Sequence, residues 1–337
     1  MNTLVLSAED KNIESAYELL NSGEIVAIPT ETVYGLAANG LNVSAVRKIF
    51  EAKGRPQDNP LILHISSINM LSDIAEYIPP LAFRLAESFW PGPLTMIFPR
   101  KKAIPSETCG GLDTVAVRMP NNRFTLSLIE KCGFPLAAPS ANTSGLPSPT
   151  SARYVYEDMK GKIPLIIDGG ECKFGVESTV ITFESEKAVR ILRPGGVTAE
   201  MLREYADVII DDGVLMKIDP DKKVLSPGMK YKHYSPKAEV FILSGSTEKI
   251  EAFLSERDNS VKTAYLGYGN ESIPSSIVSF PYGKTSEEQA EHLFSGLRLC
   301  DETQCNEVYV RIPDKSGMGL AVYNRLLRSA GFRVIEL

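Results

Sequence analysis

The residues that could do chemistry in this sequence are hydroxyls and cations that follow short apolar runs. Thr30, Thr32 and Tyr34 come directly after the apolar run 25–28, within the segment PTETVYGLAAN (29–39). Short hydroxyl side chains at a strand end can bind a polar ligand at the edge of an α/β sheet. An ordinary polar turn has a similar composition, so this segment leaves both interpretations open.

Two cations come next, in the segment KGRPQDNPLILHI (53–65). Lys53 and Arg55 leave the end of an expected helix and enter a proline-bounded loop, where they suit a phosphate or a carboxylate. The alternative is that they complement the C-terminus of that helix. His64 stands in an apolar run, which is typical of a core histidine, although strand alternation could also turn it toward the loop.

Two arginines stand at the ends of further expected strands. Arg118 lies near the end of TVAVRMP (114–120), and Thr114, four residues earlier on that strand, shares its face. Arg193 lies in LRPGG (192–196), where the fixed φ of Pro194 helps to hold the backbone. Each arginine could meet an anion, and the alternative for Arg118 is that it extends its charged head into solvent.

The densest cluster of hydroxyls lies in APSANTSGLPSPT (138–150), after the expected strand 136–138. Ser140, Ser148 and free backbone N–H groups in a rigid turn would form a neutral cradle for a phosphate. A hydrophilic surface loop is the alternative. Ser178 adds another hydroxyl in VESTVI (176–181).

Together these segments provide four cations and many hydroxyls without an obvious acid–base catalyst. The sequence has three histidines and lacks the HExxH, paired CxxC, GxSxG and P-loop patterns, and its five cysteines are expected to be reduced thiols. The inventory suits the binding of a nucleoside triphosphate and an acidic substrate. Nucleotidyl transfer can be catalysed mostly by positioning and charge stabilisation.

Composition limits the class of protein. The 337 residues predict two domains at roughly 100–200 residues each. The net charge of −6 argues against bulk electrostatic binding of nucleic acid. No run approaches the ~18 apolar residues that span a bilayer, and the N-terminus is not a secretory signal. We expect a soluble, cytoplasmic protein without a membrane partner.

The elements that must position these residues alternate irregularly, which favours an α/β fold with a mixed sheet. Ser7 is predicted to cap a first helix that Gly23 ends. Further helices are expected at 45–53, 81–89, 123–131 and 198–205, and strands at 25–28, 61–65, 95–98, 115–117, 136–138, 165–167 and 180–183. Turn-rich residues 207–237 indicate a boundary, after which a smaller α/β unit follows.

The motifs above, in this order, closely resemble the YrdC domain. The segment SPGMKYKHYSP (226–236), followed by a smaller domain, resembles the two-domain Sua5 form of that family. The resemblance implies a YrdC-like twisted mixed sheet with flanking helices and a smaller Rossmann-like α/β C-terminal domain. The expected division is a catalytic domain (1–206), a linker folding over the active site (207–237) and a C-terminal domain (238–337).

The activity that this resemblance implies is that of an L-threonylcarbamoyladenylate synthase, a nucleotidyltransferase. Such enzymes use L-threonine, bicarbonate or CO2, and ATP, release pyrophosphate, and supply the intermediate for the t6A modification of tRNA. Mg²⁺ would arrive with ATP, held largely by phosphates and waters, so no metal ligand is predicted in the chain. The expected partners are these small molecules and the downstream tRNA-modifying machinery, with weak or no direct tRNA binding.

The resemblance also assigns candidate site residues. For the threonine or carbamate side they are Thr32, His64, Arg118, Ala138 and Ser178. For ATP they are Lys53, Arg55, Thr114, Ser140, Ser148, Arg193 and Tyr231, of which Lys53 and Arg55 are the candidate catalytic residues. The division between the two sets stays open, and Tyr231 could instead pack the linker onto the domain.

Two other functions are compatible with parts of the sequence. A non-catalytic RNA-binding module of the YrdC type could use the basic patches 47–55 and 100–123. The net acidity and the lack of interleaved aromatic residues argue against it. Carbamoyl transfer from carbamoyl phosphate is the third function, but its acylphosphatase and zinc-finger parts are not visible in this sequence.

Overall fold

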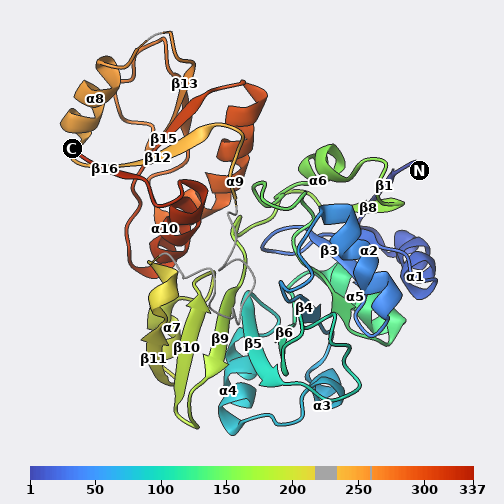
Figure 1. The fold of residues 1–337 in the computed structure, drawn as a ribbon. Helices are drawn as coiled ribbons and strands as arrows, with labels where there is room; N and C mark the ends of the chain where they lie inside the picture. Colours follow the sequence, from blue (N-terminus) through green and yellow to red (C-terminus); the bar gives the residue numbers. More distant parts are fainter. Residues whose placement is uncertain (217–233, 259) are drawn as a thin grey trace. The chain divides into compact units, whose positions relative to one another are not determined.

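The computed structural model describes residues 1–216, 234–258 and 260–337. The described residues divide into two compact units (Figure 1). Of the described residues, the first unit comprises 1–144 and 148–216, and the second comprises 145–147, 234–258 and 260–337. Most of the expected linker, including Tyr231, lies outside the described residues.

A mixed sheet is the centre of the first unit (Figure 1). Strands β1 and β8 pair in parallel, for example, whereas β2 and β3 are antiparallel. The strand order within the described residues is β1 (Leu4–Ser7), β8 (Leu165–Asp168), β2 (Val26–Ile28), β3 (Gly35–Asn39), β7 (Leu136–Ala137), β4 (Ile62–His64), β6 (Thr114–Arg118), β5 (Leu94–Pro99), β9 (Thr179–Phe183), β10 (Ala188–Arg193) and β11 (Asp207–Ile210). The predicted mixed sheet with flanking helices is confirmed.

Strand alternation divides the apolar residues of this sheet between two cores. Val26 and Ile28 pack with α1 (Ile13–Asn21) and α5 (Arg123–Cys132) on one face. Ala27 belongs to the core on the other face. That second core also includes residues of α2 (Val43–Lys53), α4 (Pro80–Phe89), α6 (Ala152–Met159) and α7 (Ala199–Arg203), while the short α3 (Leu71–Ile74) adds Leu71 and Ile74 to it.

A separate apolar strip lies on the face of the sheet that α1 and α5 cover. It extends across β4, β6, β5, β9 and β10. The strip consists of Ile62, Ile97, Ala116, Val180 and Leu192, all buried. In the register of the sheet, Ile62 and Ile97 flank Ala116, and two residues further along His64 and Thr95 flank Arg118. Alternation therefore places these polar residues on the same face as the strip, at the strand ends.

The second unit contains an all-parallel sheet, as expected for the smaller α/β domain. Its order is β14 (Val278–Pro281), β13 (Thr263–Gly267), β15 (Glu307–Arg311), β12 (Glu239–Ser244) and β16 (Val334–Glu336). Its helices are α8 (Thr247–Ser255), α9 (Ser286–Glu302) and α10 (Gly317–Ser329). Within the described residues of both units, no helix is long and apolar enough to cross a bilayer.

The sequence predictions did not include α3, α6, β10, α8 and β14, and three further elements differ from the expectation. The helix predicted from Ser7 begins at Ile13, because residues Leu4–Ser7 pair with β8 instead. Strand β3 lies inside the expected polar loop 29–39, and β11 lies inside the expected linker. In each case the deciding contact is backbone pairing with a strand that side-chain periodicity does not reveal.

Candidate active site

Arg118, at the end of β6, is the centre of a buried polar cluster. Its Nε donates to the carbonyl oxygen of Gly92 at 3.2 Å, and its Nη1 donates to Thr32 Oγ1 at 2.8 Å. Thr32 Oγ1 also lies 2.9 Å from Thr30 Oγ1, and both threonines are buried. The structure thus brings together two residues predicted for the threonine side.

His64 lies beside Arg118 on the neighbouring strand β4. Its side chain is buried, and its Nδ1 lies 3.2 Å from the carbonyl oxygen of Ile62, an arrangement in which Nδ1 donates. Burial lowers the pKa of His64 to about 3, and the positive charge of Arg118 contributes to this shift. The imidazole is therefore neutral at neutral pH, and it offers hydrogen bonding without adding charge.

Ser178 and Arg193 join the cluster from the other side. Ser178 Oγ lies 2.8 Å from Thr95 Oγ1, and Thr95 pairs in register with Arg118. Arg193 Nε donates to the Ser178 carbonyl oxygen at 3.1 Å, and its Nη2 donates to Ser178 Oγ at 3.2 Å. A chain of contacts and strand neighbours therefore connects Thr32 to Arg193.

Gly195 allows the turn of LRPGG to pack against the VEST segment. A Cβ atom at Gly195 would lie 2.3 Å from the Thr179 nitrogen and 2.5 Å from the Glu177 carbonyl oxygen. Only glycine leaves room for this contact between two backbones. The close approach keeps Arg193 against Ser178.

Lys53 carries its charge from the end of α2 into the hydroxyl-rich loop. It is 1% exposed, and its Nζ donates to the carbonyl oxygens of Ser140 and Asn142, the latter at 2.6 Å. Ser140 Oγ donates to Asn142 Oδ1 at 2.5 Å. Gly54, with φ +62°, ends the helix at this point. The structure brings the predicted pair Lys53 and Ser140 together, with the ammonium ordering the loop.

Arg55 lies against its own proline-bounded loop. Its Nη2 donates to the carbonyl oxygen of Pro60 at 3.1 Å, and its Nε donates to that of Asn59 at 3.4 Å. These contacts hold Arg55 within the loop that follows α2.

Two other candidates connect the hydroxyl-rich loop to neighbouring segments. Ser148 Oγ donates to Glu177 Oε1 at 2.6 Å, which ties the loop to the VEST segment. The nitrogen of Ala138 donates to the carbonyl oxygen of Ile62 at 3.0 Å, which places Ala138 beside β4.

Thr114 lies at the opposite end of β6 from Arg118. Thr114 lies on the same face of the sheet as Arg118, but Ala116 of the apolar strip lies between the two residues. Thr114 lines a separate cavity of about 400 Å³ with Ile97, Phe98 and Thr182. The structure therefore does not bring Thr114 into the Arg118 cluster, and Tyr231 lies outside the described residues.

The sequence analysis did not assign four polar residues of this region to the site, although Asn142 lies within the hydroxyl-rich stretch 138–150: Glu31, Thr95, Asn142 and Glu177. Glu31 and Glu177 each precede a predicted hydroxyl residue, in PTETV and in VESTV. That repeated order of acid and hydroxyl was an available signal. Thr95 gave none, because its role depends on strand pairing.

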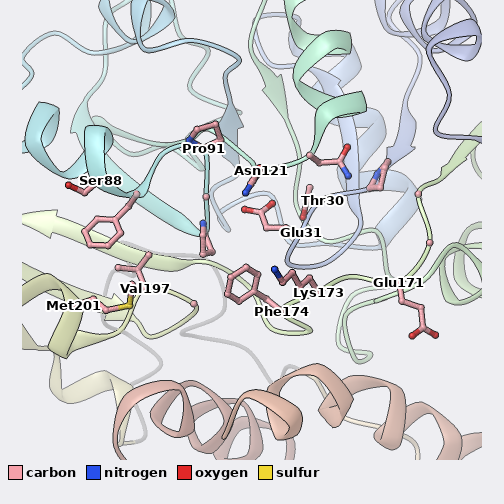
Figure 2. Close-up of a pocket in the computed structure, with 18 residues that line it drawn as sticks. Thr30, Glu31, Ser88, Pro91, Asn121, Glu171, Lys173, Phe174, Val197 and Met201 are labelled. Carbon is pink, nitrogen blue, oxygen red and sulfur yellow. The ribbon is translucent and has the colours of Figure 1, made fainter.

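A cavity of about 440 Å³ lies in the first unit beside this cluster (Figure 2). Its lining includes Glu31, Gly92, Asn121, Lys173 and Gly196. Of these, Glu31 and Gly92 contact Arg118. Among the residues that the structure describes, no group of three or more His, Cys, Asp or Glu side chains is placed to hold a metal ion.

Two family models match the chain. Residues 18–195 match the Sua5/YciO/YrdC family, described as "Telomere recombination", and residues 197–331 match "Threonylcarbamoyl-AMP synthase, C-terminal domain". The chain belongs to the Sua5/YciO/YrdC family. The resemblance predicted from the motifs is thereby confirmed.

Relatives of this family are similar over nearly the full chain. The threonylcarbamoyl-AMP synthase of Pyrococcus abyssi is 46% identical, covering 98% of this chain and 97% of the relative. That of Bacillus subtilis is 43% identical, covering 98% and 96%. A crystal structure of P. abyssi Sua5 complexed with L-threonine has a TM-score of 0.92 and 44% identity, covering 100% of this chain and 99% of that chain.

Proposed function

We propose that this chain is a threonylcarbamoyl-AMP synthase, which converts L-threonine, bicarbonate or CO2, and ATP into L-threonylcarbamoyladenylate and pyrophosphate. The observation that carries the proposal is the buried cluster of Arg118, Thr32, His64 and Ser178 at adjoining strand ends. A relative whose structure is similar over nearly the whole of both chains has been crystallised with L-threonine. The names of the full-length relatives favour this enzyme over an RNA-binding module.

The Arg118 cluster suits an amino acid with a short polar side chain. An arginine offers five N–H groups in a planar fork that matches a carboxylate. Thr32 and Ser178 offer hydroxyls for the polar groups of threonine, and neutral His64 adds a hydrogen-bonding group without charge. Ala138, next to β4, provides a small apolar wall.

The chemistry proceeds in two steps. The threonine amine attacks the carbon of CO2 and loses a proton, which gives a carbamate. A carbamate oxygen then attacks the α-phosphorus of ATP, and the bond from that phosphorus to the β-bridging oxygen breaks as pyrophosphate leaves. Neither step requires a nucleophilic side chain, so positioning and fixed charge can supply the catalysis.

Residues on both sides of the cluster suit ATP. Arg55 and Arg193 provide positive charge for the phosphates, and Lys53 orders the loop that carries Ser140 and Ser148. The apolar strip that includes Ala116, between Thr114 and Arg118 on β6, has the apolar character that suits a purine base. Mg²⁺ would enter with ATP, held mainly by phosphate and water oxygens, and the hydroxyl and amide oxygens of the loop are hard donors of the kind it accepts.

The product is a mixed anhydride that a tRNA-modifying partner would use for t6A synthesis. We expect this reaction in the cytoplasm, with little direct tRNA binding because the chain carries a net charge of −6.

The decisive measurement is pyrophosphate release by the purified full chain. Release should need L-threonine, bicarbonate and ATP together, and L-serine should support it less well. Arg118→Lys should lower kcat/KM for threonine by about 100-fold, because lysine keeps the charge and loses the fork.

Two results would contradict the proposal. One is pyrophosphate release that is equally fast without threonine. The other is tight tRNA binding that weakens steeply between 50 and 200 mM salt while no ATP is turned over, as an RNA-binding module predicts.

A further inference from the structure

Glu31 is a buried acid that the proposed reaction does not use. Its side chain is 6% exposed, and Glu31 Oε1 lies 2.7 Å from Arg118 Nη2. The pair is an ion pair outside hydrogen-bond geometry, and neither carboxylate oxygen of Glu31 accepts a hydrogen bond from the described residues. A buried carboxylate with so few partners is costly, so stability alone is a poor reason for its presence.

The contacts of Arg118 show what Glu31 contributes. Gly92 engages Nε, Thr32 engages Nη1 and Glu31 engages Nη2, so that each guanidinium nitrogen has one partner. Three fixed contacts define the plane of the guanidinium. Among the described residues, Nη1 donates one N–H to Thr32 and Nη2 donates none in hydrogen-bond geometry, so each terminal nitrogen keeps an N–H for one oxygen of a carboxylate.

Glu31 also balances the charge of the cluster. The opposite charges of Arg118 and Glu31 cancel within the pair, and His64, which is neutral at neutral pH, adds no charge beside it. An unpaired buried Arg118 would repel the ammonium group of an incoming zwitterionic amino acid. With Glu31 beside it, the same guanidinium can take the carboxylate with less repulsion of the ammonium.

We propose that Glu31 is a positioning residue that holds the guanidinium of Arg118 in the plane that accepts the carboxylate of L-threonine. This inference rests on the proposed function, and no residue of the ATP side has a part in it. It predicts that loss of Glu31 impairs the use of threonine much more than the use of ATP.

The cavity beside Glu31 makes a chemical rescue possible. Figure 2 shows Glu31 on the wall of the 440 Å³ cavity together with Asn121 and Lys173. In a Glu31→Ala variant, acetate is small enough to enter this space and to restore a carboxylate next to Arg118. Rescue by acetate would separate a need for the negative charge from a merely structural role.

The experiment measures pyrophosphate release with threonine and ATP varied separately. Glu31→Ala should lower kcat/KM for L-threonine about tenfold or more and leave the KM for ATP within about twofold. Sodium acetate should restore a large part of the loss, and sodium chloride at the same ionic strength should not. Glu31→Gln, which fills the site without charge, should show the same loss and no rescue.

Glu171→Ala is the matched control, because Glu171 lines the same cavity and is exposed. It should leave both KM values unchanged. The inference is overturned if Glu31→Ala keeps its kcat/KM for threonine within threefold of the wild type, if both substrates are impaired equally, or if acetate does not rescue. Wild-type chain without threonine-dependent release would refute the proposed function itself, which keeps the two failures distinct.

Discussion

His64 is neutral in a site built around arginines, and this has a consequence for stability. Burial depresses the pKa of His64 to about 3, whereas an unfolded histidine titrates near 6.5. The unfolded chain therefore binds a proton below pH 6.5 that the folded chain does not bind. The stability that the neutral imidazole confers is present above pH 6.5 and is lost as the pH falls from 6.5 toward 3.

We predict that this loss is visible when wild type is compared with His64→Gln. Between pH 7 and pH 5, the free energy of unfolding should fall by about 2 kcal/mol more in the wild type than in the variant, which cannot titrate at this position. Trp90, the single tryptophan, is buried in the first unit and its fluorescence reports the unfolding in urea. A pH-independent difference between the two proteins would contradict the prediction, because it would show that His64 has the same pKa in the folded and the unfolded chain.

The buried side chain of Lys53 binds the protein's own backbone. From the sequence it was expected to face a phosphate, and the structure has its ammonium on two carbonyl oxygens of the loop 138–150. Its assignment to ATP stays a prediction. The described contacts give it a second task, because an ordered loop presents Ser140 and Ser148 at fixed positions.

At the scale of elements, the turn after β10 depends on glycine. We predict that Gly195→Ala destabilises the first unit by about 2 kcal/mol, since the new Cβ would overlap the backbone of Glu177 and Thr179. Urea unfolding followed by Trp90 fluorescence measures the change. Glu186→Ala, at an exposed position between β9 and β10, is the control and should stay within about 0.5 kcal/mol of the wild type. Equal stability of the two variants would contradict the close packing.

At the scale of the whole molecule, three residues of the hydroxyl-rich loop belong to the second unit. Residues 145–147 group with it, and Arg298 of α9 directs Nε and Nη2 at the carbonyl oxygen of Pro147 at 3.2 and 2.6 Å. The flanking Ser144 and Ser148 belong to the first unit. Arg298 thereby fixes the carbonyl group of Pro147, the residue directly before Ser148.

We predict that Arg298→Ala lowers the rate of threonine-dependent pyrophosphate release about tenfold, because the loop loses the two N–H groups that hold Pro147. Hydrogen exchange of the peptide 140–150 should become faster at the same time. Arg333→Ala, a partly exposed arginine elsewhere in the second unit, should change neither quantity. Unchanged exchange in Arg298→Ala would contradict the anchoring role.

Much of this molecule was predictable from its sequence. The strands 61–65 and 165–167 and the helix ending at Lys53 were recognisable, because apolar periodicity and capping glycine are local signals. The residues Thr32, Arg118, Ser178 and Arg193 were also recognisable as members of one site from their motifs. Strand β1 was not, because its formation depends on pairing with β8, a partner some 160 residues away in the sequence.

The sequence by itself determined which residue types are available: arginines and hydroxyls at strand ends, with few histidines and none of the usual catalytic patterns. These properties are local, so the order of the motifs was enough to indicate the family and the type of reaction. Only the tertiary structure decided that Glu31 pairs with Arg118, that Thr95 joins Ser178 and that Thr114 stands apart. Such contacts depend on strand register and on burial, which arise when distant segments pack together.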